Sequence, residues 1–270
     1  MQEATMAVYI HCNFNSEVLR MATDVNILIP DNDRVRQFRE KTNVPVKYQT
    51  LYLLHGFSCD YTYYLRKTNI ERYADEHQIM VVMPSMYNSA YTDMKYGLEY
   101  YTYLSEELLD FVERTFPASA EKENRFVAGM SMGGYGAYKF GLSCPEKFAA
   151  VAGIAGSYHA EHRYQGKVST VSTLCEALYG DPPEITPEVH DIFTLLERLS
   201  KSGQKIPRLY ICCGTEDGMY RNSEDLKKLA DQLEVPMVFE QGPGKHDDKY
   251  CDMALQRILD WMDFKGKAGV

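Results

Sequence analysis

The stretch that decides the fold runs from Arg125 to Phe140 and reads RFVAGMSMGGYGAYKF. Its first six residues, RFVAGM, are largely apolar and predict a buried strand, and a helix is expected from Gly133 onward. Glycines crowd around Ser131, although a glycine inside a regular element costs about 0.5–1 kcal/mol. Such a cluster indicates a turn whose backbone a side chain would obstruct.

Ser131 is the centre of the pattern Gly129-Met130-Ser131-Met132-Gly133, at the expected junction of strand and helix. This is the context of a nucleophile elbow, in which a sharp turn projects the serine oxygen from the sheet edge. We expect a side chain at either flanking glycine to collide with neighbouring backbone, and Gly134 to let the helix pack closely. The helix N-terminus would then aim free N–H groups at a developing oxyanion. An idle serine in a glycine-rich turn is the alternative, because the pattern is short.

The segments around this turn predict an α/β architecture. Strands are expected at residues 6–14, 20–30, 50–56, 79–84, 125–130, 148–156, 208–214 and 236–242. Helices are expected at residues 62–77, 98–116, 133–144, 223–233 and 247–264. Because most of these strands are apolar throughout, the sequence predicts a mostly parallel sheet covered by helices on both faces.

The first two strands look antiparallel, so we expect one mixed sheet in a single domain of residues 1–270. Residues 157–200 break the alternation with a long polar segment, which is typical of a lid or substrate-binding insertion.

Composition limits the classes of partner. The chain has 270 residues, of which 45% are hydrophobic and 25% charged, as in ordinary globular proteins. A net charge of −9 argues against binding nucleic acid or an anionic membrane through bulk charge. The N-terminus lacks the features of a signal peptide, and no apolar run approaches the roughly 20 residues that span a bilayer. Seven cysteines without framework spacing suit reduced thiols in the cytoplasm.

A serine nucleophile needs a base and an acid that orients the base, and in this fold the chain order is serine, acid, histidine. His246 lies in the loop directly after the last predicted strand, whereas the other histidines after Ser131 all fall in the insertion. We therefore expect His246 to be the base, with a solvated surface histidine as the alternative. Glu216 and Asp217 both follow the preceding strand, and either carboxylate could orient the imidazole.

Two backbone N–H donors are needed to stabilise the oxyanion, and losing one typically costs ~10²–10³ in rate. The first is expected from Met132, the residue after the nucleophile. The second is expected from Phe57, in the loop HGFSCD that follows the strand beginning at Thr50. His55 in this loop precedes the serine, so we interpret it as a residue that shapes the loop by bonding backbone, not as the base.

Substrate contacts are expected from two segments. The oxyanion loop supplies His55 and Gly56, and the tyrosine-rich region that follows the strand at 79–84 supplies Tyr91 and Tyr96. Aromatic walls suit apolar or phenolic acyl groups, although a packed helix start explains the tyrosines equally well.

No cofactor and no metal are expected. The pair His159 and His162 has metal-like spacing, but no third ligand stands at a useful distance in the sequence. No phosphate-binding loop of the G-x-x-x-x-G-K-[ST] type is present either. The expected partner is a small-molecule ester, without nucleic acid or membrane.

Seven segments together resemble one family of enzymes. They are LYLLHGFSCD, NIERYADE, VVMPSMYNSAYTDMKYG, YYTYLSEELLDFVERTFP, FVAGMSMGGYGAYKFGL, CGTEDGMY and KHDDKY. The resemblance, over roughly Ala7 to Phe264, is to the bacterial tributyrin-esterase group of the esterase D-like α/β-hydrolases. That branch also holds S-formylglutathione hydrolases, feruloyl and acetylxylan esterases and mycolyltransferases.

The resemblance implies an α/β-hydrolase fold with Ser131 as nucleophile, Asp217 as acid and His246 as base. It also implies the oxyanion amides of Phe57 and Met132. Relatives often carry an aromatic residue after the histidine-aspartate pair, whereas this chain continues Asp-Lys-Tyr from residue 248.

The expected function is a serine carboxylesterase acting through an acyl-enzyme on small or short-acyl esters. Acetyl, butyryl, acetylated-sugar and hydroxycinnamoyl esters all suit the resemblance. An S-formylglutathione hydrolase-like thioesterase or an acyltransferase on the same triad is the alternative, followed by a non-catalytic binding protein. A homo-oligomer also stays open, because several relatives associate.

Overall fold

The computed structural model describes residues 7–31, 46–159, 169–180 and 186–264. Eight strands form one sheet in the order β1-β2-β4-β3-β5-β6-β7-β8. The strands are β1 (Val8–Ser16), β2 (Met21–Ile29), β3 (Thr50–Leu54), β4 (Met80–Pro84), β5 (Arg125–Met130), β6 (Ala150–Ile154), β7 (Arg208–Gly214) and β8 (Met237–Gly242). The pairs β1–β2 and β2–β4 are antiparallel and every other pair is parallel, which confirms the mixed sheet.

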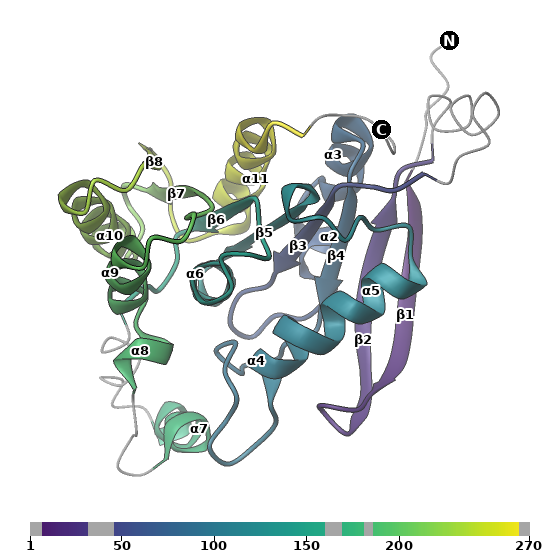
Figure 1. Ribbon diagram of the computed structural model, residues 1–270, viewed down its shortest axis with the longest axis horizontal. Helices are drawn as coiled ribbons and strands as arrows, with labels where there is room; N and C mark the ends of the chain where they lie inside the picture. The colour runs from purple at the N-terminus through teal and green to yellow at the C-terminus, as the bar shows by residue number, and fades with distance from the viewer. Residues whose placement is uncertain (1–6, 32–45, 160–168, 181–185, 265–270) are drawn as a thin grey trace.

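Helices cover both faces of the sheet (Figure 1). They are α2 (Tyr63–Lys67), α3 (Ile70–His77), α4 (Tyr100–Thr102), α5 (Leu108–Thr115), α6 (Met132–Ser143), α7 (Ser169–Tyr179), α8 (Pro187–His190), α9 (Ile192–Lys201), α10 (Tyr220–Gln232) and α11 (Asp248–Met262). None of the described helices is long and apolar enough to cross a bilayer.

The two faces of the sheet form separate cores because strand side chains alternate. Along β3, Tyr52 and Leu54 belong to the core beneath α5, α6, α9 and α10, whereas Leu51 and Leu53 belong to the core beneath α2, α3 and α11. All five residues of β3 are buried, as the apolar run predicted.

Two expected helices are interrupted. The helix predicted at 62–77 is split into α2 and α3, because Thr68 adopts an extended conformation. The backbone N–H and the side-chain amide of Asn69 instead donate to the carboxylate of Asp252 in α11, each at 2.8 Å. The helix predicted at 98–116 contains a π-helical turn at Tyr103–Glu107 between α4 and α5.

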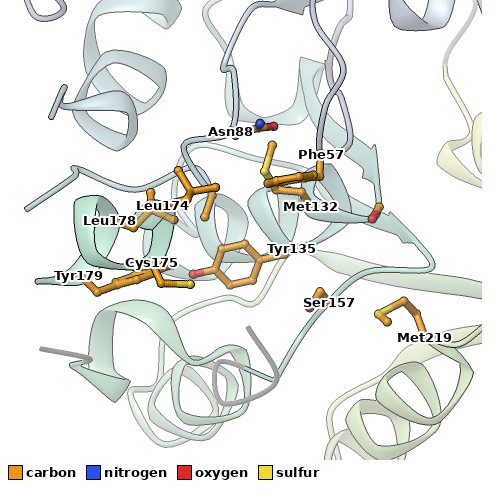
Figure 2. Close-up of a pocket in the computed structure, with 12 residues that line it drawn as sticks. Phe57, Asn88, Met132, Tyr135, Ser157, Leu174, Cys175, Leu178, Tyr179 and Met219 are labelled. Carbon is orange, nitrogen blue, oxygen red and sulfur yellow. The ribbon is translucent and has the colours of Figure 1, made fainter. Parts of the chain in front are cut away.

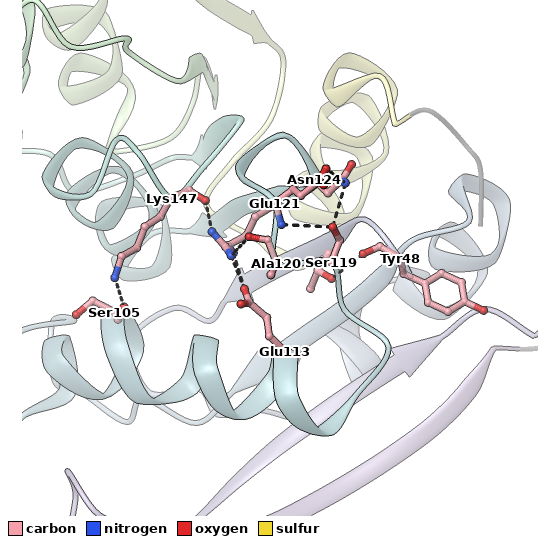
Figure 3. A network of polar contacts seen from close by, with 10 residues as sticks. Tyr48, Ser105, Glu113, Ser119, Ala120, Glu121, Asn124 and Lys147 are labelled. Atoms are coloured by element: carbon pink, nitrogen blue, oxygen red, sulfur yellow. Dashed lines mark hydrogen bonds and ion pairs between the residues drawn. The ribbon is translucent and has the colours of Figure 1, made fainter. Parts of the chain in front are cut away.

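A polar network anchors the start of β5, at the edge of the sheet opposite the elbow (Figure 3). The buried guanidinium of Arg125 bonds the Glu113 carboxylate on α5, and it also donates to the carbonyl of Ala120 at 2.8 Å. A further N–H donates to the carbonyl of Lys147, whose ammonium reaches the carbonyl of Ser105 on the π-helical turn. The network holds the amino-terminal end of β5, and Ser131 follows the carboxyl-terminal end of the same strand.

The segment predicted as an insertion contains helices. Within 157–200, the described residues form α7, α8 and most of α9. The C-terminal end of α7 is tied to the loop before α4, since the N–H groups of Lys95 and Tyr96 donate to the carbonyls of Leu178 and Ala177. Figure 1 shows α7 beside this loop, away from the sheet.

Candidate active site

Ser131 stands between β5 and α6 in a strained conformation. Its φ of 57° and ψ of −118° lie where a residue with a side chain rarely sits. Its N–H donates to the carbonyl of Ile154 at the end of β6, at 2.8 Å. Strain of this kind persists only where the surroundings enforce it, and it clusters at functional sites. The serine is partly exposed at the carboxyl end of the sheet.

The flanking glycines allow the elbow to approach β3. A Cβ at Gly133 would lie 1.9 Å from the carbonyl oxygen of Leu54, and one at Gly129 would lie 2.4 Å from the oxygen of Gly133. A Cβ at Gly134 would lie 3.1 Å from the Cα of Gly156, so this glycine permits close packing as well. The expected collisions with backbone at positions 129 and 133 are therefore confirmed.

The structure brings His246 and Asp217 together at the ends of β8 and β7. Nδ1 of His246 lies 2.8 Å from Oδ2 of Asp217, and the other carboxylate oxygen accepts the N–H of Met219 at 2.8 Å. The side chain of Asp217 is 1% exposed, so its charge acts on the imidazole with little solvent screening. Glu216 points away and lies near Lys245 at the surface. Of the two candidate acids, Asp217 is the one that contacts the histidine.

The hydrogen bond to Asp217 raises the pKa of His246, and partial burial opposes that shift. The carboxylate holds the proton on Nδ1, which leaves Nε2 as the basic nitrogen. The imidazole side chain is 39% exposed, so a substrate can approach it. These properties suit a general base whose orientation is fixed by a buried acid.

The oxyanion loop lies against the elbow. A Cβ at Gly56 would lie 3.6 Å from the Cβ of Ser131, so the residue is adjacent to the serine, as expected for this loop. Met132 opens α6, where the first N–H groups of a helix have no intrahelical acceptor. The Phe57 side chain, which is 49% exposed, lines the same cavity as Ser131 and Met132.

His55 shapes this loop from within. Its Nδ1 bonds the carbonyl of Gly56 at 2.8 Å, and its Nε2 accepts the N–H of Met86 at 2.9 Å. Burial lowers its pKa, which keeps the ring neutral. The interpretation of His55 as a backbone-bonding residue is confirmed, and both ring nitrogens are occupied.

None of the four expected substrate contacts is among the residues that line the cavity beside Ser131. His55 is buried beneath the loop, and Tyr91 is fully buried with its hydroxyl donating to the carbonyl of His55 at 2.7 Å. Both side chains are turned inward and bond the backbone of this loop. Tyr96 is 62% exposed, and its backbone N–H donates to the carbonyl of Ala177 in α7.

A cavity of about 320 Å³ opens beside Ser131 (Figure 2). Its lining is mostly apolar and comes from Phe57, Asn88, Ala90, Ser131, Met132, Tyr135, Ser157, Leu174, Cys175, Leu178, Tyr179 and Met219. Figure 2 shows the α7 residues on the far side of Tyr135 from Ser157 and Met219. The sequence analysis had named Phe57, Ser131 and Met132 of this set but not the other lining residues. The i, i+4 spacing of Leu174 and Leu178 was the one available signal of an apolar face on α7.

A metal site finds no support in the described part of the chain. There, no group of three or more histidine, cysteine, aspartate or glutamate side chains could hold an ion. The ring of His159 stacks on Phe193, with 4.1 Å between ring centroids, and its Nε2 lies 3.6 Å from Asp225. His162 lies outside the described residues.

The fold and the site together define a serine hydrolase of the α/β-hydrolase class. The model of a family described as putative esterase matches residues 16–263. An acetyl esterase of Caldicellulosiruptor saccharolyticus is 27% identical over 266 residues, which cover 93% of this chain and 96% of the relative. The chain therefore belongs to this esterase family, and it is a carboxylic ester hydrolase.

Two solved structures from Staphylococcus aureus are also similar. The fluorophosphonate-binding serine hydrolase FphF has a TM-score of 0.87 at 37% identity, over 95% of this chain and 98% of that chain. The S-formylglutathione hydrolase FrmB has a TM-score of 0.83 at 36% identity, with the same coverage. This chain is thus similar both to a fluorophosphonate-binding serine hydrolase and to an S-formylglutathione hydrolase.

Proposed function

We propose that this chain is a carboxylesterase for short-acyl esters, with Ser131 as nucleophile, His246 as base and Asp217 as the acid that orients it. The observation that carries the proposal is the strained Ser131 in the wall of an apolar cavity, at the sheet edge that also holds the His246–Asp217 pair. Three residues from three strand ends supply the three roles that acyl transfer needs.

In the proposed reaction, Ser131 Oγ attacks the ester carbonyl while His246 takes its proton. The N–H groups of Met132 and Phe57 stabilise the oxyanion. His246 then returns the proton to the leaving alcohol, and an acyl-enzyme remains. Water, activated by the same imidazole, attacks the acyl-enzyme and releases the acid. Throughout, Asp217 keeps the imidazole in one tautomer and stabilises its protonated form.

The cavity supports a small acyl group. Ligand pockets usually enclose ~300–1,000 Å³, and the cavity beside Ser131 is at the small end of that range. We propose that the insertion at 157–200 acts as the substrate-binding lid, because Leu174 and Leu178 of α7 close the apolar side. The acetyl esterase relative supports acetyl and similar acyl groups as substrates.

Thioester hydrolysis is the second candidate, because FrmB is an S-formylglutathione hydrolase. The glutathione part of such a substrate carries two carboxylates and an amine. None of the described residues that line the cavity carries a charge. This lining favours an oxygen ester with an apolar acyl group.

The test is hydrolysis of p-nitrophenyl esters from acetate to octanoate, and of S-formylglutathione, by wild type and Ser131→Ala. Ser202→Ala is the matched control, since its hydroxyl donates to the carbonyl of Leu199 at the end of α9, outside both the proposed lid and the cavity. We expect wild type and the control to hydrolyse the esters with acyl chains from acetyl to butyryl rapidly. The rate of Ser131→Ala should be lower by several orders of magnitude. If Ser131→Ala were as active as wild type, the assignment of Ser131 as nucleophile would be refuted. If wild type preferred S-formylglutathione to the oxygen esters, thioester hydrolysis would be the function.

A cytoplasmic location is also proposed, because the seven cysteines, which all lie among the described residues, form no disulfide with one another, as expected in a reducing compartment. Association into a homo-oligomer remains a prediction, which light scattering on the purified protein measures.

A further inference from the structure

The residue two positions after His246 is held by a different part of the molecule. Asp248 is the first residue of α11, and its Oδ1 accepts a hydrogen bond from the Tyr63 hydroxyl at 3.1 Å. Its Oδ2 lies 2.9 Å from Nζ of Lys67. Both donors belong to α2, the helix that follows the oxyanion loop. One carboxylate therefore joins the loop of His246 to the helix that follows the loop of the expected oxyanion donor Phe57.

The same helix also contacts the elbow. The Tyr63 oxygen lies 3.4 Å from Sδ of Met130, the residue immediately before Ser131. The hydroxyl of Tyr64 donates to the carbonyl of Leu54 at 2.8 Å and accepts the N–H of Met130 at 3.1 Å. Thus α2 contacts the end of β3, the elbow and the start of α11. These are the three segments whose mutual distances set the geometry of the site.

The contact suits positioning better than general stabilisation. The side chains of Asp248 and Lys67 are 45% and 47% exposed, and ion pairs at that exposure contribute little to folding stability. Tyr63 is half-buried, and burial is the main reason that the pKa of its hydroxyl is well above its usual range. The hydroxyl therefore remains a donor at any working pH, while Lys67 holds the pKa of Asp248 below its usual value. The hydrogen bond between Tyr63 and Asp248 therefore persists over the working pH range.

We propose that Tyr63 and Asp248 are positioning residues that fix the imidazole of His246 at the distance from Ser131 required for proton transfer. This inference rests on the proposed function. The start of α11 is also held by the contact of Lys67 with Asp248 and by Asp247, which caps α11 by accepting the N–H of Tyr250 at 2.9 Å. Neither of these contacts includes an elbow residue, so without the bond from Tyr63 the start of α11 can shift relative to Met130. A misplacement of about 1 Å costs on the order of 10²-fold in rate, so a fraction of that movement is measurable.

The experiment compares Tyr63→Phe, Asp248→Ala and the double variant in the full-length protein. Three quantities are measured: kcat and KM for p-nitrophenyl butyrate, the rate of labelling by a fluorophosphonate probe, and the melting temperature. We expect each single variant to lower kcat and the labelling rate by about 10-fold, with KM within about twofold. The rate of the double variant should fall by much less than the product of the two single effects, because both substitutions remove the same Tyr63–Asp248 hydrogen bond. The pH midpoint of kcat/KM should not move, since the Asp217 bond to His246 is intact.

Tyr73→Phe is the matched control. Tyr73 on α3 lies close enough to Asp252, one turn after Asp248 in α11, for this carboxylate to add to the burial that raises the pKa of the Tyr73 hydroxyl. Tyr73→Phe removes a tyrosine hydroxyl that faces α11, as Tyr63→Phe does. We therefore expect a similar change in melting temperature, but the kcat and labelling rate of wild type.

Wild-type kcat and labelling in Tyr63→Phe would overturn the proposal, as would an equal loss in Tyr73→Phe. If wild type hydrolysed no ester, the proposed substrate would be wrong, but the labelling rates would still decide the positioning role. The probe requires only an activated serine.

Discussion

Replacing Gly133 with alanine tests the close approach that creates the elbow. The added Cβ would lie 1.9 Å from the carbonyl oxygen of Leu54 and 2.8 Å from that of His55. Contacts of a Cβ below 3.0 Å are essentially absent from proteins, so the two backbones must separate by about 1.1 Å. Leu54 is the last residue of β3, which is paired on both sides by β4 and β5. The elbow is therefore the part that moves.

A displacement of about 1 Å at the nucleophile is expected to lower kcat on the order of 10²-fold. Overpacking of this kind costs about 3 kcal/mol, which for a chain of this size lowers the melting temperature by roughly 6–12 °C. The assay is p-nitrophenyl acetate hydrolysis together with thermal unfolding. Gly242→Ala is the control, because no atom lies within 4 Å of its added Cβ. If Gly133→Ala kept the kcat and melting temperature of wild type, the steric account of the elbow would be refuted.

The remaining predictions concern the acid, the base and the cavity. Asp217→Asn should lower kcat by about 10⁴-fold because the imidazole loses its fixed tautomer, whereas the same change at the solvent-exposed Glu216, to Gln, should leave kcat within about twofold; steady-state kinetics distinguishes the two. Because the base must be neutral and its pKa is raised by Asp217, kcat/KM should fall as the pH drops through a midpoint above the ordinary 6.5 of His246; a pH–rate profile with its midpoint below that value would contradict the assigned pair. Leu178→Ala should enlarge the cavity and raise the ratio of kcat/KM for octanoate to that for acetate by about 10-fold, and an unchanged ratio would place the acyl group elsewhere.

Much of the fold was predictable because the relevant information is local. The apolar runs gave all eight strands, and the elbow was recognisable because Gly129 and Gly133 relieve clashes within a few residues of Ser131. The break between α2 and α3 was not predictable, because it depends on the bonds of Asn69 to Asp252, which is 183 residues away. Helical periodicity is continuous through that break in the sequence.

Some residues of the candidate site were likewise predictable from local sequence, and others were not. The choice of His246 followed from its place after the last strand, and the family resemblance favoured Asp217. Only the direction of each side chain shows that Asp217, and not Glu216, contacts the histidine. Tyr91 resembles a cleft residue in the sequence, but its ring lies against Gly136, where an added Cβ would lie 2.4 Å from the ring. A residue type does not reveal on which side of a loop it packs.

By itself, the sequence determined the strand order along the chain, the strained serine turn and the positions of the histidine and the acids. Each of these depends on the conformational preferences of a short segment. Only the tertiary structure decided which side chains line the cavity, and that α2 holds the start of α11 through Tyr63 and Asp248, 185 residues apart. Contacts of that kind arise when distant segments pack against one sheet. The conformational preferences of short segments therefore do not predict them.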